Sequence, residues 1–366
     1  MLIQIVIILK LYISIKSYEY NEYNEYKPII GIYGIPNPEN EKEKINETYY
    51  PGSIIRFLDS FGAEIIAIHY WYDDKLIDEL LKEINLILFI GTNRTLNITD
   101  IWEQKALNII NKGKKNNVPI YGISQGFQLI ISLISETNEI LKNDYDDFNI
   151  YHNLFNLNNQ SQIFYLFDNK TFDILLNKNS TLYFHNNGFS KEDFENNKNL
   201  KEFQISSLSK DKKGKIFVNS FESLNSNQTI FGTQFNNDII IYDRCINSTI
   251  NYHNDAIRIS NLFNSFIVNL ARNNNNKMEI EKRNNYDFFD LYSNKTNYFK
   301  YDSDKDLFYF KKPKIKVEYH LIPLIFIICF ESIIIFTIIN AFYHFWYKYD
   351  DDNEPIENEE NEKLIP

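Results

Sequence analysis

The sequence predicts an α/β domain in which helices cover both faces of a central parallel sheet. Short apolar runs of strand length alternate with amphipathic helical patterns over residues 28–135, and this alternation is typical of parallel sheets. The 366 residues hold enough apolar material for one core of about 250 residues and some further segments. A long apolar stretch near the C-terminus additionally predicts one transmembrane helix.

The elements follow each other closely along the chain. Strands are predicted at 28–33, 64–68, 86–90, 118–121 and 229–235. Helices are predicted at 53–60, 75–83, 101–112, 127–134 and 255–271. In the second of these helices, Leu76, Leu80 and Leu81 share one face, as a helix packed on a sheet requires. Residues 144–222 show a looser pattern.

A sharp turn joins the strand at 118–121 to the helix at 127–134. Its sequence is Gly122-Ile123-Ser124-Gln125-Gly126, in which glycines flank a small residue at two positions' distance. Such a turn presents one side chain at the positive end of a helix, which describes a nucleophile elbow. Taken literally, it is the Gly-x-Ser-x-Gly of serine hydrolases. Ligand sites in these sheets lie beyond the carboxyl ends of the strands, where Gly91 and Ser124 both fall.

Charge and cysteine content exclude some classes of protein. The net charge is -11, and residues 346–366 carry -6 of it, with eight acidic and two basic side chains. No basic face indicates nucleic-acid binding. Cys245 is the only cysteine before the predicted transmembrane helix and Cys329 lies within it, so no internal disulfide framework is expected.

Hydrophobic segments at both ends predict a single-pass type I membrane protein. Residues 1–17 fit a signal peptide, 321–345 a transmembrane helix that contains Glu331, and 346–366 an acidic cytoplasmic tail. The polar segment 273–320 is predicted to be an irregular stalk. Four lysines just before the transmembrane helix run against the positive-inside tendency, although a cleaved signal would set the orientation.

Glycosylation sequons agree with a lumenal or extracellular domain. All nine precede the transmembrane helix, at Asn46, Asn93, Asn97, Asn159, Asn169, Asn179, Asn227, Asn247 and Asn294.

The order of motifs over residues 27–272 resembles gamma-glutamyl hydrolase, a family of the class I glutamine amidotransferase-like superfamily. The matching stretches are 27–32, 49–50 with 54–63, 84–91, 119–127, 184–185, 231–236 and 252–256. The resemblance implies a three-layer sandwich around a mostly parallel sheet. It also implies a hydrolase, an omega peptidase that removes gamma-linked glutamates from folate polyglutamates and needs neither cofactor nor metal.

The resemblance assigns a role to each residue of the expected site. Ser124 stands where the family has its nucleophilic cysteine, Asn236 where it has its histidine, and Asp238 at the acidic position. His185 corresponds to a histidine of the pocket. Oxyanion and substrate positions fall on Gly91, Gln125 and, loosely, Tyr50.

These substitutions predict a catalytically impaired protein. A serine hydroxyl needs a neighbouring base to take its proton, and asparagine is not a base. Loss of the nucleophile or the base in a catalytic triad costs on the order of a millionfold in rate. His185 is an alternative base if it reaches Ser124, although a structural role for this histidine is the simpler interpretation.

Two other functions remain open at this stage. An active serine-type hydrolase would use Ser124 with Asp238 or Asp243 and His253, in the chain order of α/β-hydrolases. A non-catalytic membrane-anchored binding or sorting protein would keep the fold and a pocket for folate polyglutamate or a gamma-glutamyl peptide. Leu364 and Ile365 fit an acidic dileucine-type signal for sorting adaptors, and the predicted location is endolysosomal or at the cell surface.

Overall fold

The computed structural model describes residues 27–36, 47–91, 94–225, 229–242, 254–274, 299–302 and 305–311. The chain divides into two compact units, Met1–Lys312 and Pro313–Pro366, and every described residue belongs to the first. Within these described ranges, no helix is long and apolar enough to cross a membrane.

Several predicted features lie outside the described residues. They are the signal peptide 1–17, the transmembrane helix 321–345 with Glu331 and Cys329, the tail 346–366 with Leu364 and Ile365, the sequons at Asn46, Asn93, Asn227, Asn247 and Asn294, and Asp243, Cys245 and His253.

A seven-stranded sheet forms the centre of the first unit, in the order β4-β1-β5-β6-β11-β10-β9. The strands are β1 (Ile29–Tyr33), β4 (Glu64–Ile68), β5 (Leu86–Phe89), β6 (Ile120–Ile123), β9 (Phe203–Lys210), β10 (Ile216–Ser223) and β11 (Ile230–Thr233). From β4 to β11 all neighbouring strands pair in parallel, whereas β10 pairs antiparallel with both of its neighbours, β11 and β9. The predicted mixed α/β fold with a mostly parallel sheet is therefore confirmed.

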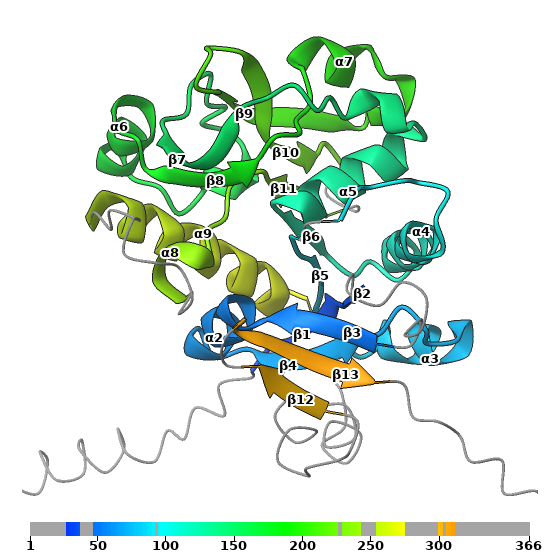
Figure 1. Ribbon diagram of the computed structural model, residues 1–366. Coiled ribbons are helices and arrows are strands. Elements are labelled where there is room, and N and C mark those ends of the chain that lie inside the picture. The colour runs from blue at the N-terminus through cyan, green and yellow to red at the C-terminus, as the bar shows by residue number, and fades with distance from the viewer. Residues whose placement is uncertain are drawn as a thin grey trace, which may run out of the picture. The chain divides into compact units, whose positions relative to one another are not determined.

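Helices lie on both faces of this sheet (Figure 1). The α-helices are α2 (Gly52–Ser60), α3 (Asp74–Leu80), α4 (Ile101–Lys115), α5 (Gln125–Ser135), α6 (Asn169–Asn177), α7 (Lys191–Asn196), α8 (Ile239–Tyr242) and α9 (Asn254–Arg272). The described residues also contain the short 3-10 helices η2 (Asn138–Ile140), η3 (Gln162–Phe164) and η4 (Lys198–Leu200).

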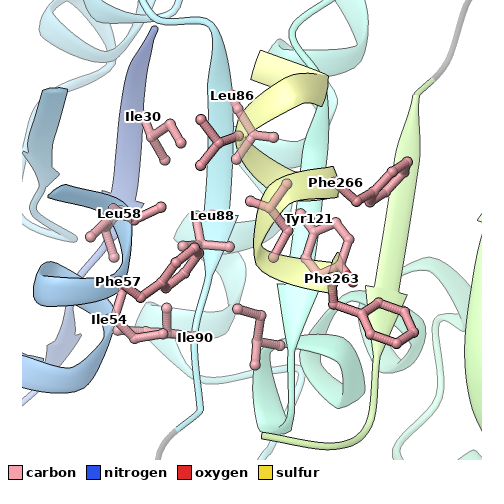
Figure 2. Packing of buried hydrophobic residues seen from close by; sticks show 14 of the residues in the cluster. Ile30, Ile54, Phe57, Leu58, Leu86, Leu88, Ile90, Tyr121, Phe263 and Phe266 are labelled. Atoms are coloured by element: carbon pink, nitrogen blue, oxygen red, sulfur yellow. The ribbon is translucent and has the colours of Figure 1, made fainter. Parts of the chain in front are cut away.

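Alternation along the strands divides the core into two layers. On one face, Ile30 and Leu88 pack with Phe57 of α2 and Phe263 of α9 (Figure 2). On the other face, Ile87 packs in a second cluster with side chains of α3, α4 and α5. Each fully buried side chain of this kind stabilises the fold by about 1.5–3 kcal/mol. Because successive strand residues point to opposite faces, strands buried on both sides read as continuous apolar runs.

The loosely patterned region 144–222 carries regular structure of its own. It contains α6, α7, the antiparallel pair β7 (Asp147–His152) and β8 (Thr181–His185), and the hairpin of β9 and β10. All of these elements are inserted between β6 and β11, which are parallel neighbours in the central sheet.

The segment predicted as an irregular stalk forms part of a second sheet. This sheet has the order β12-β13-β3-β2, and its strands are β2 (Ile35–Pro36), β3 (Glu47–Pro51), β12 (Phe299–Asp302) and β13 (Leu307–Lys311). β13 pairs with β3 along its whole length. The stalk prediction is wrong for the described part of this segment, because Tyr309 and Phe310 are buried against the core of the domain. The compact unit extends to Lys312 rather than ending at residue 272.

Candidate functional site

Ser124 occupies the tight turn between β6 and α5. Its backbone has a φ of 55° and a ψ of -118°, an unusual conformation for a residue with a side chain. The Ser124 backbone N–H donates to the Thr233 carbonyl of β11 at 2.8 Å. A Cβ on Gly126 would overlap the Phe89 carbonyl, so only glycine lets α5 approach β5 this closely. The structure thus places Ser124 on the strand-to-helix turn that the sequence predicted.

Ser124 and Asn236 line the same cavity, which we call the Asn236 cavity. It has a volume of about 410 Å³. Its lining residues are Tyr49, Pro51, Ser53, Ile54, Gly91, Ser124, Phe148, Phe184, Asn236, Asp238, Ile239, Lys305 and Leu307. The carboxyl ends of β5 and β6 reach this cavity, as expected for a parallel sheet.

Asn236 has a buried amide side chain. Its backbone N–H donates to the Leu182 carbonyl at 2.9 Å, whereas its side-chain Oδ1 is buried without a hydrogen-bond partner in the described structure. An amide oxygen accepts hydrogen bonds but takes up no proton near neutral pH. The side chain can therefore orient a donor group in the cavity, but it cannot act as a general base.

Asp238 is buried at the wall of the same cavity. Its Oδ2 accepts a hydrogen bond of 2.6 Å from the Ser53 hydroxyl, which α2 supplies. This carboxylate is thus tied to α2 at the cavity wall.

His185 lies at the end of β8 and lines a second cavity, the His185 cavity. The lining residues are Arg94, Thr95, Ser124, Gln125, Gln128, Phe148, Phe184, His185, Asn186 and Asn187. Ser124, Phe148 and Phe184 line both cavities, so the two meet at Ser124.

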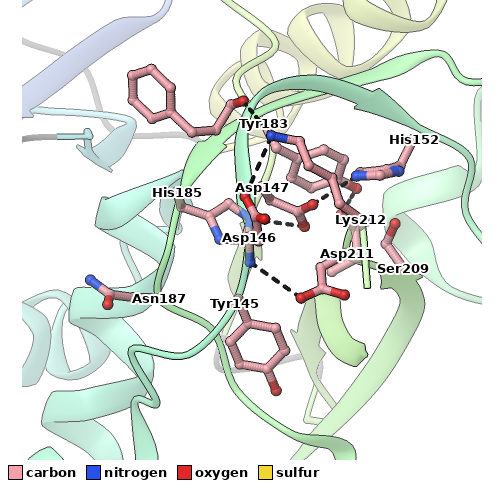
Figure 3. A network of polar contacts seen from close by, with 12 residues as sticks. Tyr145, Asp146, Asp147, His152, Tyr183, His185, Asn187, Ser209, Asp211 and Lys212 are labelled. Carbon is pink, nitrogen blue, oxygen red and sulfur yellow. Dashed lines mark hydrogen bonds and ion pairs between the residues drawn. The ribbon is translucent and has the colours of Figure 1, made fainter. Parts of the chain in front are cut away.

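The His185 imidazole is buried and weakly basic. Burial lowers the pKa of His185 to about 3, against a smaller opposing effect of the Asn187 backbone. Neither ring nitrogen has a hydrogen-bond partner within the described ranges, and Nε2 lies 3.9 Å from Asp147 Oδ2. The other Asp147 oxygen is 2.7 Å from His152 Nε2, and Figure 3 shows Asp147 between the two histidines. His185 is consequently neutral near pH 7.

The other predicted site residues divide between the cavities and the core. Gly91 lies so close to Ser124 that an added Cβ would be 3.4 Å from the Ser124 hydroxyl oxygen. Gln125 lines the His185 cavity, and its side-chain N–H donates to the Arg94 carbonyl. The placement of Tyr50 needs correction, since its hydroxyl is buried against His69 Nδ1 at 3.0 Å. Tyr49, the preceding residue of β3, lines the Asn236 cavity instead, because neighbouring strand residues face opposite ways.

Comparison with curated proteins identifies the relationship. Gamma-glutamyl hydrolase B of Dictyostelium discoideum is 25% identical over 264 residues, covering 69% of this chain and 75% of its own. Gamma-glutamyl hydrolase of Mus musculus is 25% identical over 243 residues, covering 64% and 75%. The chain is homologous to the gamma-glutamyl hydrolases. No protein-family model matches it. A solved glutamine amidotransferase from Thermotoga maritima is 12% identical with a TM-score of 0.39, covering 67% of this chain and 98% of its own.

Sequence reasoning missed three kinds of lining residue in this gamma-glutamyl hydrolase homologue. Arg94 lies in the loop after β5, three residues beyond the predicted Gly91. Its charge so close to a predicted site residue could have identified it. Phe148 is 59% exposed and pairs edge-on with Phe184 at 5.6 Å between ring centroids. Lys305 and Leu307 come from the segment predicted to be a stalk, and no local sequence pattern indicates that they line a cavity.

Proposed function

We propose that this gamma-glutamyl hydrolase homologue binds gamma-linked glutamates and has lost the hydrolytic step. The observation that carries the proposal is the pairing of Ser124 and Asn236 across one cavity. Serine becomes a nucleophile only when a neighbouring group takes its proton. At the position expected for the histidine base, the Asn236 cavity has the amide of Asn236. This supports an elbow that keeps its backbone shape but has no base to activate Ser124.

The remaining candidate base also supports this proposal. A general base works best when its pKa lies near the working pH. With a pKa of about 3, His185 has little affinity for the serine proton. Asp238, the acid that would orient a catalytic histidine, instead accepts from Ser53.

The retained part of the function is ligand binding. Asn236 and Gln125 each present a buried side-chain oxygen without a hydrogen-bond partner in the described structure. Both residues line the cavities that meet at Ser124. Unpaired buried polar atoms cost free energy, and the amide N–H groups of a gamma-glutamyl ligand would satisfy them.

An active serine hydrolase is the second candidate. It is favoured by one observation: Ser124 and His185 line the same cavity, and Asp147 lies 3.9 Å behind the His185 ring. In this arrangement His185 would be the base and Asp147 would orient it. The distance of 3.9 Å between His185 and Asp147 is longer than a hydrogen bond, so the orienting contact is not made.

A hydrolysis assay on the full chain separates the two candidates. Pteroyl-triglutamate is the substrate, and release of glutamate is the measurement. We expect no release by the unmodified protein, and release by the double variant Ser124→Cys, Asn236→His, because the restored thiol and imidazole form the missing pair. The Ser124→Cys single variant is the matched control for the histidine. Binding of the intact ligand is measured in parallel by calorimetry.

Other outcomes would identify the alternative. Glutamate release by the unmodified chain that disappears in Ser124→Ala contradicts the loss of hydrolysis. If His185→Gln abolishes that release as well, the second candidate is supported. Failure of the unmodified chain to bind the ligand removes the binding proposal itself.

We also propose that the site faces the lumen or the extracellular space, with the chain anchored by one helix at 321–345. Three of the sequons in the described ranges, at Asn159, Asn169 and Asn179, are exposed, as glycosylation requires. The fourth, Asn97, donates its side-chain N–H to Asp100 at 2.8 Å. Enzymatic deglycosylation followed by a mobility shift tests this orientation, and an unshifted protein would contradict it.

A further inference from the structure

Two residues at the start of the β13 segment form part of one wall of the Asn236 cavity. Lys305 and Leu307 of the β12–β13 hairpin line the cavity together with Tyr49 and Pro51 of β3. β13 and β3 pair in register, with Leu307 opposite Pro51 and Tyr309 opposite Tyr49. A segment remote in sequence from Ser124 thus contributes a charged side chain to the same cavity.

The hairpin turn is anchored to the start of α2. The Asp306 carbonyl accepts from the Gly52 N–H at 2.8 Å, and the Asp306 carboxylate accepts from Arg56 Nη1 at 2.8 Å. Asp306 is 4% exposed. Lys305 itself donates its backbone N–H to Asp302 Oδ1 at 3.2 Å. These contacts hold the Lys305 backbone at the cavity rim.

Two charged side chains line the Asn236 cavity, and their positions differ. Asp238 is buried and bonded to Ser53, whereas Lys305 is exposed at the rim. An incoming ligand therefore meets the ammonium group first.

We propose that Lys305 recognises a carboxylate of the ligand in the Asn236 cavity, which makes the β12–β13 hairpin a specificity element. The inference rests on the proposed function and names one residue that selects the ligand. A gamma-linked chain of glutamates leaves one α-carboxylate free on each residue, so a chain that crosses Ser124 presents a carboxylate within this cavity. A rim ammonium group also predicts affinity that weakens with salt.

Calorimetry on the full chain with two peptide probes tests this role. The probes are gamma-linked triglutamate and the same peptide with its α-carboxylates amidated. We expect Lys305→Gln to weaken binding of the acidic peptide by about threefold, the range of a solvent-exposed ion pair. Charge reversal in Lys305→Glu should weaken it by about tenfold. Binding of the amidated peptide should be weaker and should not respond to these substitutions.

Lys82→Glu is the matched control. Lys82 is exposed and lies just before β5, at the opposite edge of the sheet from Ser124, and its substitution makes the same change in net charge. We expect it to leave both affinities unchanged. If Lys305→Glu unfolds the protein, the role of Lys305 is tested with Lys305→Gln alone, which adds no negative charge.

The outcomes distinguish the two proposals. If the unmodified chain binds the acidic peptide and Lys305→Gln and Lys305→Glu behave like Lys82→Glu, the role of Lys305 is overturned and the proposed function stands. An equal loss for both peptides also overturns it, because a carboxylate contact is then not what Lys305 makes. If the unmodified chain binds neither peptide, the proposed function falls, and the role of Lys305 falls with it.

Discussion

The Asn236 cavity has two walls that are built in different ways. The elbow wall, made of Gly91 and Ser124, is held by backbone contacts, since α5 packs against β5 so closely that Gly126 has no room for a Cβ. The hairpin wall, made of Tyr49, Pro51, Lys305 and Leu307, is held by contacts between distant parts of the chain: the pairing of β13 with β3 and the bonds of Asp306 to Gly52 and Arg56. The backbone geometry of the elbow can thus persist when its reactive side chain changes. The position of the Lys305 charge depends instead on long-range contacts.

A buried histidine supports the hairpin wall from behind. His69 Nδ1 lies 2.7 Å from Thr48 Oγ1 and 3.0 Å from the Tyr50 hydroxyl, and its ring stacks on Trp71 with centroids 4.4 Å apart. Phe310 of β13 contacts the same ring. His69 therefore has polar partners that His185, on the other side of the site, does not have.

The elbow wall should be the less tolerant of substitution. In Gly126→Ala the new Cβ meets the Phe89 carbonyl, and we expect a loss of about 3 kcal/mol in the free energy of unfolding. Chemical denaturation measures this loss. The control is Gly214→Ala, where φ is 81° and nothing lies within 4 Å, so that only the backbone conformation costs about 1 kcal/mol. Equal losses in both variants would mean that crowding does not hold the elbow.

The hairpin wall should depend on one ion pair. Asp306→Ala leaves the Arg56 guanidinium, 22% exposed in the folded protein, without this carboxylate. We expect a loss of about 2 kcal/mol, between the values for surface and buried pairs. Glu195→Ala breaks the exposed pair with Lys191 on α7 and should cost within about 0.5 kcal/mol. A similar small effect for Asp306→Ala would show that the hairpin is held without the ion pair.

The histidines beside the two walls should make stability depend on pH. Burial lowers the pKa of both His69 and His185 to about 3, whereas an unfolded histidine has a pKa of about 6.5. The unfolded chain therefore binds protons first, and the free energy of unfolding falls as pH decreases below about 6.5. Each histidine contributes up to about 1.4 kcal/mol per pH unit. This stability is fully present above that pH.

His185→Phe and His69→Phe separate the two contributions. Thermal unfolding is followed between pH 6.5 and pH 5. Burial raises the pKa of Asp147, so this carboxyl acts in the opposite direction in the unmodified protein and in both variants. Each variant should reduce the slope by one histidine's share. An unchanged slope in His185→Phe would show that this ring is not held neutral by the fold.

The smallest expected effect concerns the strain stored at the elbow. Ser124 has a φ of 55°, which glycine adopts more readily. Ser124→Gly should therefore stabilise the protein by about 1 kcal/mol. Asn117→Gly, at a φ of 53°, should gain less because asparagine tolerates this region. Denaturation midpoints measure both, and destabilisation by Ser124→Gly would show that the serine side chain contributes packing worth more than the strain.

Much of the central domain could be predicted from local pattern. The strands β1, β4, β5 and β6 are apolar runs, and α9 carries an amphipathic stripe. Each of these patterns is contained within its own short stretch of sequence. Helix α4 extends to Lys115 rather than ending at residue 112, because its last turn is polar and gives no hydrophobic signal. The region between β6 and β11 was harder, since β7 pairs with β8 across the intervening η3 and α6.

The candidate site shows the same division. The positions of Ser124, Gly91 and Asn236 follow from the ends of neighbouring parallel strands, which sequence order already implies. The resemblance placed Tyr50 loosely at a substrate position, and the sequence of β3 does not reveal which of its two faces is buried. Only the contact with His69 decides that.

By itself, the sequence determined the elbow, because glycine spacing and strand-to-helix order are local properties that the backbone must obey. The tertiary structure decided that Lys305 belongs to the cavity and that His185 is buried and weakly basic. Both depend on contacts between segments more than 30 residues apart. Burial and long-range pairing are set by the packed whole, and no local pattern contains them.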